Sequence, residues 1–175
     1  EDLRHDVRTA VGFPMDKEDV LRQGEKVSDT WRVLGVSHEE SERLWERRVW
    51  VEGASSQRMA LVLDFAHGQR RYDQTFVAGT AVTATLAFAP GGLSSRAMVV
   101  EVKASAETMG PIAAEEAWDA SLNAVANALA SNPWLTRWPF RGHATPFRSD
   151  GGWFAADGAW RTLKLKVDDD DGWQL

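Results

Sequence analysis

The feature that most limits how this chain can fold is residues 31–103, where apolar and polar side chains alternate with a period of two. Such alternation is typical of β-strands, because successive side chains point to opposite faces of a sheet. The most apolar segment of this stretch is Arg58–Phe65, and we expect it to form a central strand with both faces covered. Its two faces are made by Ala60 and Val62 on one side and by Met59, Leu61, Leu63 and Phe65 on the other.

Five segments of this stretch have the length and pattern of strands, and polar or Gly-containing turns separate them. Ser37–Glu42 is one such turn and Gly53–Gln57 another. We expect an antiparallel meander that curls into a barrel-like sheet, because a sheet that is apolar on both faces must be covered. The predicted strands are Trp31–Val36, Arg43–Glu52, Arg58–Phe65, Thr80–Ala89 and Arg96–Lys103.

Helical patterns lie on both sides of the strands. Leu3, Val7 and Val11 predict one short helix, and Lys17–Gln23 predicts a second, between an N-cap at Asp16 and a C-cap near Gly24. Ala114–Ala130 is the longest helical pattern, and Asn132-Pro133 ends it.

Near the C-terminus, Gly152–Ala156 and Ala159–Val167 flank Asp157-Gly158, a hairpin turn signal. The predicted fold is therefore mainly β with α (α+β). It has three parts: an N-terminal helical segment (1–28), a barrel-like domain with helix 114–130 packed on it (29–140), and a C-terminal hairpin segment (141–175).

Composition restricts the chemistry of the chain. It has no Cys, a net charge of −6, and no apolar run near the roughly 20 residues that cross a bilayer. We therefore expect a cytoplasmic protein without disulfides and without a membrane partner. The four His (His5, His38, His67 and His143) are dispersed, and the acidic run Asp168–Asp171 lacks the spacing of a calcium loop. We predict no metal or cofactor site in this chain.

Catalysis has little support in the sequence, which contains neither a Gly-x-Ser-x-Gly motif nor a phosphate-binding loop. Asp64 is the one acidic residue inside the most apolar strand. We expect it to be structural, either capping the strand end or pairing with Arg58, Arg70 or Arg71. An enzyme is accordingly the least favoured of the functions considered.

Basic and aromatic residues interleave near the C-terminus. Residues 136–167 contain six bases and two acids, for a net charge of +4, together with three Trp and three Phe. Single-stranded nucleic acid needs charge for its phosphates and flat rings for its bases. The alternative is that the rings pack under the hairpin while the bases face solvent. The candidate binding residues are Arg137, Trp138, Arg141, Arg148, Trp153, Trp160, Lys164 and Lys166.

A second candidate surface is Arg47-Arg48 with Trp45 and Trp50. The competing explanation is cross-strand packing of the rings with both charges outside, and we favour it here.

Several segments, in order, resemble the region that follows the zinc finger in bacterial SWIM zinc-finger proteins. The resemblance extends from about Val11 to Pro139 and consists of hydrophobic segments without a catalytic signature. The segments are Thr30–Gly35, Arg47–Gly53, Arg58–Ala66, Gly79–Phe88 and Asn132–Pro139.

The family's zinc motif, Cys-x-Cys followed by Cys-x-His, has no counterpart here, so no zinc ligand carries over to this sequence. The resemblance implies a downstream domain of a longer protein, whose upstream finger would hold the zinc and bind DNA or protein. The initial Glu1 also favours a piece of a longer chain.

The function we expect first is a non-catalytic interaction or scaffold domain of a SWIM-type protein. Its partner would be another protein or the rest of its own longer chain. The alternative is a nucleic-acid-binding β-barrel that uses residues 136–167.

Overall fold

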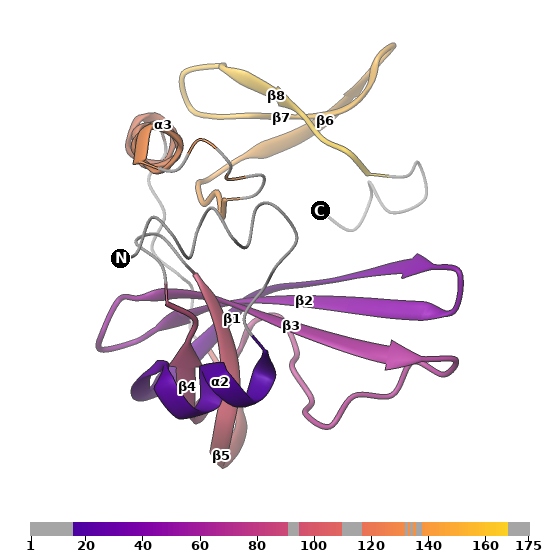
Figure 1. The fold of residues 1–175 in the computed structure, drawn as a ribbon. Helices are drawn as coiled ribbons and strands as arrows, with labels where there is room; N and C mark the ends of the chain where they lie inside the picture. The colour runs from indigo at the N-terminus through magenta and orange to yellow at the C-terminus, as the bar shows by residue number, and fades with distance from the viewer. Residues whose placement is uncertain are drawn as a thin grey trace. The chain divides into compact units, whose positions relative to one another are not determined.

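The computed structural model describes residues 16–90, 95–109, 117–131, 133, 135 and 138–167. Its contacts divide the chain into two compact units, Glu1–Pro111 and Ile112–Leu175. Figure 1 shows the strands β1–β5 of the first unit and the strands β6–β8 of the second. The predicted helix over Leu3–Val11 and the acidic run Asp168–Asp171 lie outside the described residues.

The first unit begins with helix α2, which spans Lys17–Gln23 as the sequence predicted. Asp16 makes no side-chain capping bond, but Val20 is buried and its carbonyl accepts a hydrogen bond from the Gly24 amide. A Cβ at Gly24 would lie 2.5 Å from the carbonyl oxygen of Phe88, so only glycine allows this close approach. Five strands follow: β1 (Glu25–Ser41), β2 (Leu44–Gly53), β3 (Met59–His67), β4 (Thr80–Phe88) and β5 (Arg96–Thr108).

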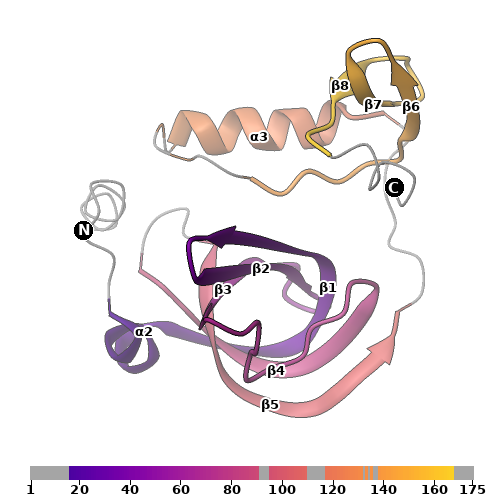
Figure 2. The same cartoon turned by 90° about the vertical axis from the view of Figure 1, so that its right-hand side faces the viewer.

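These five strands form a closed ring of hydrogen-bonded neighbours in the order β1-β2-β3-β5-β4. β1 is long enough to pair with β4 along Glu25–Arg32 and with β2 along Trp31–Ser41, with a register shift between Val33 and Gly35. Figure 2 shows the strands curving around a common interior. The predicted all-antiparallel meander is wrong in one respect, because β3 and β5 are parallel neighbours and β4 lies on the far side of β5.

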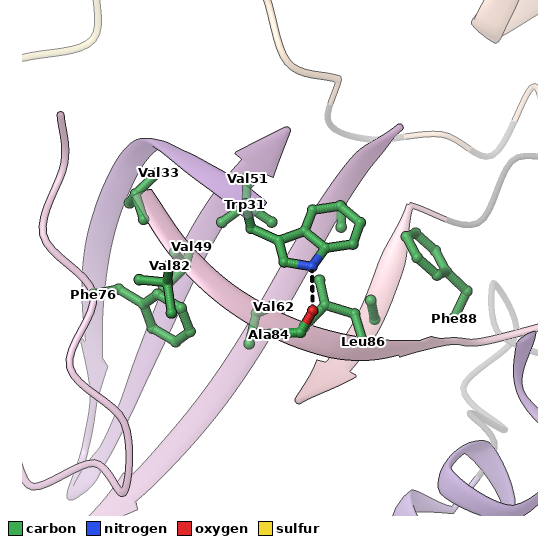
Figure 3. Close-up of a cluster of buried hydrophobic side chains, with 12 residues drawn as sticks. Trp31, Val33, Val49, Val51, Val62, Phe76, Val82, Ala84, Leu86 and Phe88 are labelled. Atoms are coloured by element: carbon green, nitrogen blue, oxygen red, sulfur yellow. Dashed lines mark hydrogen bonds between the residues drawn. The ribbon is translucent and has the colours of Figure 1, made fainter. Parts of the chain in front are cut away.

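Inward-facing side chains of all five strands fill the ring (Figure 3). Trp31 is 1% exposed, and its indole Nε1 donates a hydrogen bond of 3.0 Å to the Ala84 carbonyl, so the ring's largest buried side chain has its polar atom satisfied. Phe76 enters the same cluster from the loop after β3. Ala60 and Val62 of β3 are both buried here, on the one face that the period-two pattern predicted them to share.

Past the ring, β1, β2 and β3 continue as a three-stranded sheet that extends away from β4 and β5 (Figure 1). The predicted turn Ser37–Glu42 is mostly strand, and the chain reverses only at Glu42, which has a φ of 57°. The polar side chains of this segment find partners across the strands: Glu39, for example, forms an ion pair with Arg48. Pairing of this kind lets a charged sequence form a strand.

Arg47 and Arg48 are both buried, so the expectation that both charges are exposed is wrong. Arg48 lies on the outward side of β2, opposite Leu63, and its ion pairs with Glu39 and Glu46 cover it there. Arg47 hydrogen-bonds to Asp64 through two nitrogens, and Nη1 donates to the Gln74 carbonyl at 2.8 Å. Its guanidinium lies 4.1 Å from the ring centre of Tyr72. Asp64 thus pairs with Arg47, and not with any of the three arginines considered from the sequence.

The second unit contains helix α3 (Asp119–Ser131) and a three-stranded antiparallel sheet. Residues 114–116 of the predicted helix lie outside the described residues. The sheet consists of β6 (Thr145–Ser149), β7 (Gly152–Ala156) and β8 (Thr162–Lys164), in that order. The sequence predicted the β7–β8 hairpin but not strand β6. It also placed helix α3 in one domain with residues 29–140, whereas the contacts divide the chain between Pro111 and Ile112 and so assign α3 to the second unit.

Candidate binding surfaces

A buried carboxylate organises the turn between β7 and β8. Asp157 Oδ1 accepts hydrogen bonds from the Ala159 and Arg161 amides, and Oδ2 accepts one from the Trp118 amide before α3. The Arg161 guanidinium bridges Asp157 and Asp119, with Nε 2.8 Å from Asp157 Oδ2 and Nη1 2.7 Å from Asp119 Oδ1. The turn is therefore anchored to the start of α3.

These contacts also determine the charge states. Burial would raise the pKa of Asp157, but the hydrogen bonds from Arg161, Trp118 and Ala159 outweigh it, so the pKa lies below its usual value. The hydrogen bond from Arg161 lowers the pKa of Asp119, and the two carboxylates raise the pKa of Arg161. All three groups are therefore charged at neutral pH.

The turn holds Trp160 in an unusual position. The Trp160 amide donates to the Asp157 carbonyl at 3.0 Å, and the Asp157 amide donates to the Arg161 carbonyl at 3.1 Å. The loop is thus Gly158-Ala159-Trp160, one residue longer than an Asp-Gly turn. Its last residue has a φ of +60°, the left-handed conformation that three-residue hairpin loops usually give to glycine. Trp160 adopts it while 78% exposed.

An open hollow of about 340 Å³ lies beside this indole. Its lining comes entirely from the second unit, from the segment before β6, from the paired residues Thr145 and Ala156, and from the turn. The lining residues are His143, Ala144, Thr145, Ala156, Asp157, Gly158 and Trp160.

The strand register assigns the other aromatic residues to the two faces of this sheet. Phe147 pairs directly with Phe154, which pairs directly with Lys164, so all three share one face with Thr145 and Ala156. The two phenyl rings are stacked, with centroids 5.6 Å apart and an interplanar angle of 20°. Both rings are partly exposed and Lys164 is exposed.

The opposite face carries Trp153, which is 4% exposed, and directly across from it Arg148, which is exposed. The residues predicted to form one site are therefore divided between two faces and a turn. Trp138 is partly buried and Arg141 and Lys166 are exposed, while Arg137 lies outside the described residues. Phe147 and Phe154 were not among the predicted site residues, because without strand β6 nothing in the sequence shows that they are paired.

The first unit has a surface of a different kind. The outward side of β3 carries Met59, Leu61, Leu63 and Phe65, which we name the β3 stripe. The first three are partly exposed and Phe65 is 52% exposed. On β2, Trp50 lies directly opposite Leu61. The strand predicted to be covered on both faces is thus covered by the ring interior on one face and partly exposed on the other.

Among the residues that the structure describes, no helix is long and apolar enough to span a bilayer. Nor do any three His, Asp or Glu side chains in the described ranges gather closely enough to hold a metal ion. Comparisons of the chain with protein-family models, with curated proteins and with solved structures found no match. The similarity to the SWIM zinc-finger proteins stays a prediction that rests on the sequence.

Proposed function

We propose that this chain is a non-catalytic interaction module that binds a protein partner through the β3 stripe. The observation that carries the proposal is the exposure of Phe65, 52%, at the end of a continuous apolar row on the outer side of a strand. Outward positions of an antiparallel sheet are usually polar when they face water. A contiguous apolar row on such a face is typical of a protein–protein contact.

The ring's own stability does not explain this row. Ala60 and Val62 supply the core-facing side of β3 and are both buried. The outward residues of the same strand are not members of the buried cluster that the described residues form, and Phe65 keeps half of its surface in contact with solvent. Burial of exposed apolar surface against a partner yields about 25 cal/mol per Å², so an aromatic residue here is suited to act as an anchor.

The charges around the stripe favour a protein over a nucleic acid. On the outward side of β2, Arg48 forms ion pairs with Glu39 and Glu46, both at 2.6 Å. Farther along the same strand, Oε2 of Glu52 lies 3.7 Å from Nη1 of Arg32. Arg96 of β5, which pairs with Leu61 in the strand register, is a third base on this side. Three bases therefore face three carboxylates, and the face lacks the excess positive charge that phosphate binding requires.

We further propose that the ring is a small closed barrel. The order β1-β2-β3-β5-β4 and the shared interior support this description. The OB-fold is a five-stranded, partly open barrel that binds oligonucleotides and oligosaccharides through the face of its second and third strands and through adjoining loops. The location of the surface is what the two share, whereas the matched charges of this face favour a different class of ligand. This is an analogy between folds, and the β3 stripe itself carries the functional argument. If the resemblance to SWIM proteins is correct, the partner is either a separate protein or another part of a longer parent chain.

Site-specific photo-crosslinking tests the proposal. A benzoylphenylalanine is placed at position 65 and, as a matched control, at position 100, because Val100 of β5 is also exposed, at 41%. We expect one dominant protein product from position 65 and none from position 100. Binding of that purified partner should weaken at least tenfold in Phe65→Ser and remain unchanged in Val100→Ser.

Equal products from both positions, or a partner that binds Phe65→Ser as tightly as the natural chain, would contradict the proposal. A crosslinked product that is nucleic acid would also overturn it.

A further inference from the structure

The second unit carries its aromatic side chains along one face of a small sheet. Ala156, which lines the hollow beside Trp160, lies two residues from Phe154 on the same face of β7. Two residues of a strand span about 7 Å, so the hollow and the stacked Phe147–Phe154 pair are neighbouring positions on that face. We name Phe147, Phe154 and Trp160, together with Lys164, the aromatic track.

Folding stability does not explain Trp160. A left-handed backbone conformation is unfavourable for a residue with a Cβ, and glycine adopts it without that penalty. Trp160 is also left 78% exposed, so its apolar surface gains little from folding. Strained and exposed positions of this kind concentrate at ligand-binding sites. An indole beside an open hollow therefore indicates a flat ligand that stacks on it.

The charge of the same segment indicates the class of ligand. Residues 138–167 contain five bases and two acids. Of the bases, Arg161 is paired with both Asp157 and Asp119, and Arg148 lies on the opposite face of the sheet. Lys164 lies on the same face as the stacked phenyl rings, since it pairs with Phe154 across the strands. Its Cε would be 3.7 Å from a Cβ placed at Gly152, which puts the lysine stem over the end of β7. Lys164 thus places a cation beside flat rings, an arrangement suited to an anion that carries flat groups.

We propose that the aromatic track binds single-stranded nucleic acid. One base stacks on Trp160 at the hollow, the next stacks on the Phe147–Phe154 pair, and Lys164 contacts the backbone phosphate beside them. Stacking without base-edge readout tolerates most sequences. The site is in a different unit from the β3 stripe and shares no residue with it. Trp153 and Arg148, which lie on the opposite face of the sheet, are not part of it.

Fluorescence anisotropy on the full chain tests this site. The probes are labelled oligothymidine and oligouridine of about 12 nucleotides, each at about 50 and 200 mM salt. We expect both probes to bind, and more weakly at the higher salt. Trp160→Gly should weaken binding by about tenfold or more, and Trp160→Phe should retain most of it. Because glycine suits the backbone at this position, a loss of binding in Trp160→Gly is not a loss of folding.

Two variants that each remove one positive charge distinguish a direct phosphate contact by Lys164 from a general attraction between the protein and the nucleic acid. Lys164→Gln should reduce the slope of log K against log salt by about 0.7, the value for one phosphate of a single strand. Lys103→Gln, an exposed lysine of β5 in the other unit, should leave that slope unchanged. Neither variant should alter crosslinking at position 65, so failure here and failure of the proposed protein contact are distinguishable.

Three results would overturn the inference. They are equal affinity of Trp160→Gly and the natural chain, equal binding of a duplex of the same length, and binding that is tighter for a neutral oligosaccharide and independent of salt. A preference for oligouridine over oligothymidine, or the reverse, would support the site and name which nucleic acid it takes.

Discussion

Replacement of Arg47 by methionine should destabilise the first unit strongly, although arginine on a strand is ordinarily a surface residue. The Arg47 side chain is 5% exposed. It donates two hydrogen bonds to Asp64 and one to the Gln74 carbonyl, and it lies over the rings of Tyr72 and Phe76. Methionine retains the apolar stem and removes every one of these polar contacts. The change therefore isolates the role of the guanidinium.

The expected loss of stability depends on the Asp64 carboxylate, which is left without its partner in Arg47→Met. Removal of one partner of a buried ion pair typically costs about 3–5 kcal/mol, because the other charge is left without compensation. Asp64 is 33% exposed, so water solvates part of its charge and the loss falls near the lower limit, about 3 kcal/mol. The double variant with Asp64→Asn should lose less than the sum of the two single changes. We expect a coupling energy of about 1.5 kcal/mol.

Hydrogen exchange read by peptide in increasing urea is the suitable assay, because it reports separately on peptides from 16–109 and from 117–167. The control is Arg22→Met, which breaks the exposed Arg22–Asp19 pair of α2 and should cost less than about 0.5 kcal/mol. A loss below about 1 kcal/mol for Arg47→Met, or a coupling energy near zero, would refute the argument that this arginine is part of the core.

Two further predictions concern the second unit. Gly142→Ala places a Cβ 2.5 Å from Cδ1 of the buried Trp118 ring and should destabilise this unit by about 1–3 kcal/mol, which exchange in peptides from 117–167 will measure. Because the folded-state pKa of Asp157 lies below its usual value of 3.8, its contribution to stability is fully present above about pH 4 and is lost as pH falls through the lowered pKa. Near-UV circular dichroism should show a smaller acid-dependent loss in Asp157→Asn than in the natural chain, because only Asp119 is then left to titrate against Arg161, and the variant should already be destabilised at neutral pH.

Local sequence patterns predicted a helix or strand correctly where interactions between neighbouring residues are what form it. The helix Lys17–Gln23 is found within the predicted bounds, and the period-two alternation of β3 correctly placed Ala60 and Val62 on one face, although it did not show that this face alone is the buried one. These features depend on neighbouring residues, which a sequence displays directly. The segment Ser37–Ser41 was mistaken for a turn, since its polar side chains find their partners on β2, which the local pattern does not show.

The candidate surfaces were only partly predictable. The interleaving of bases and rings predicts a binding surface within residues 136–167, which contain Trp160 and Lys164. The choice of Trp153 as an exposed ring is not supported by its 4% exposure. Phe147 and Phe154 were recognised as aromatic residues in that stretch, but their stacking depends on strand β6, whose short and proline-containing sequence has a weak strand signal.

The amino-acid sequence by itself determined that this chain is rich in strands, lacks thiol chemistry, and has one strand, β3, that is apolar on both sides. Only the tertiary structure decided that β5 lies beside β3, that Arg47 is buried against Asp64, and that Trp160 stands exposed at a turn. The physical reason is the range of the interactions. Periodicity and turn chemistry act between near neighbours, whereas strand order, charge burial and exposure depend on contacts between residues far apart in the chain.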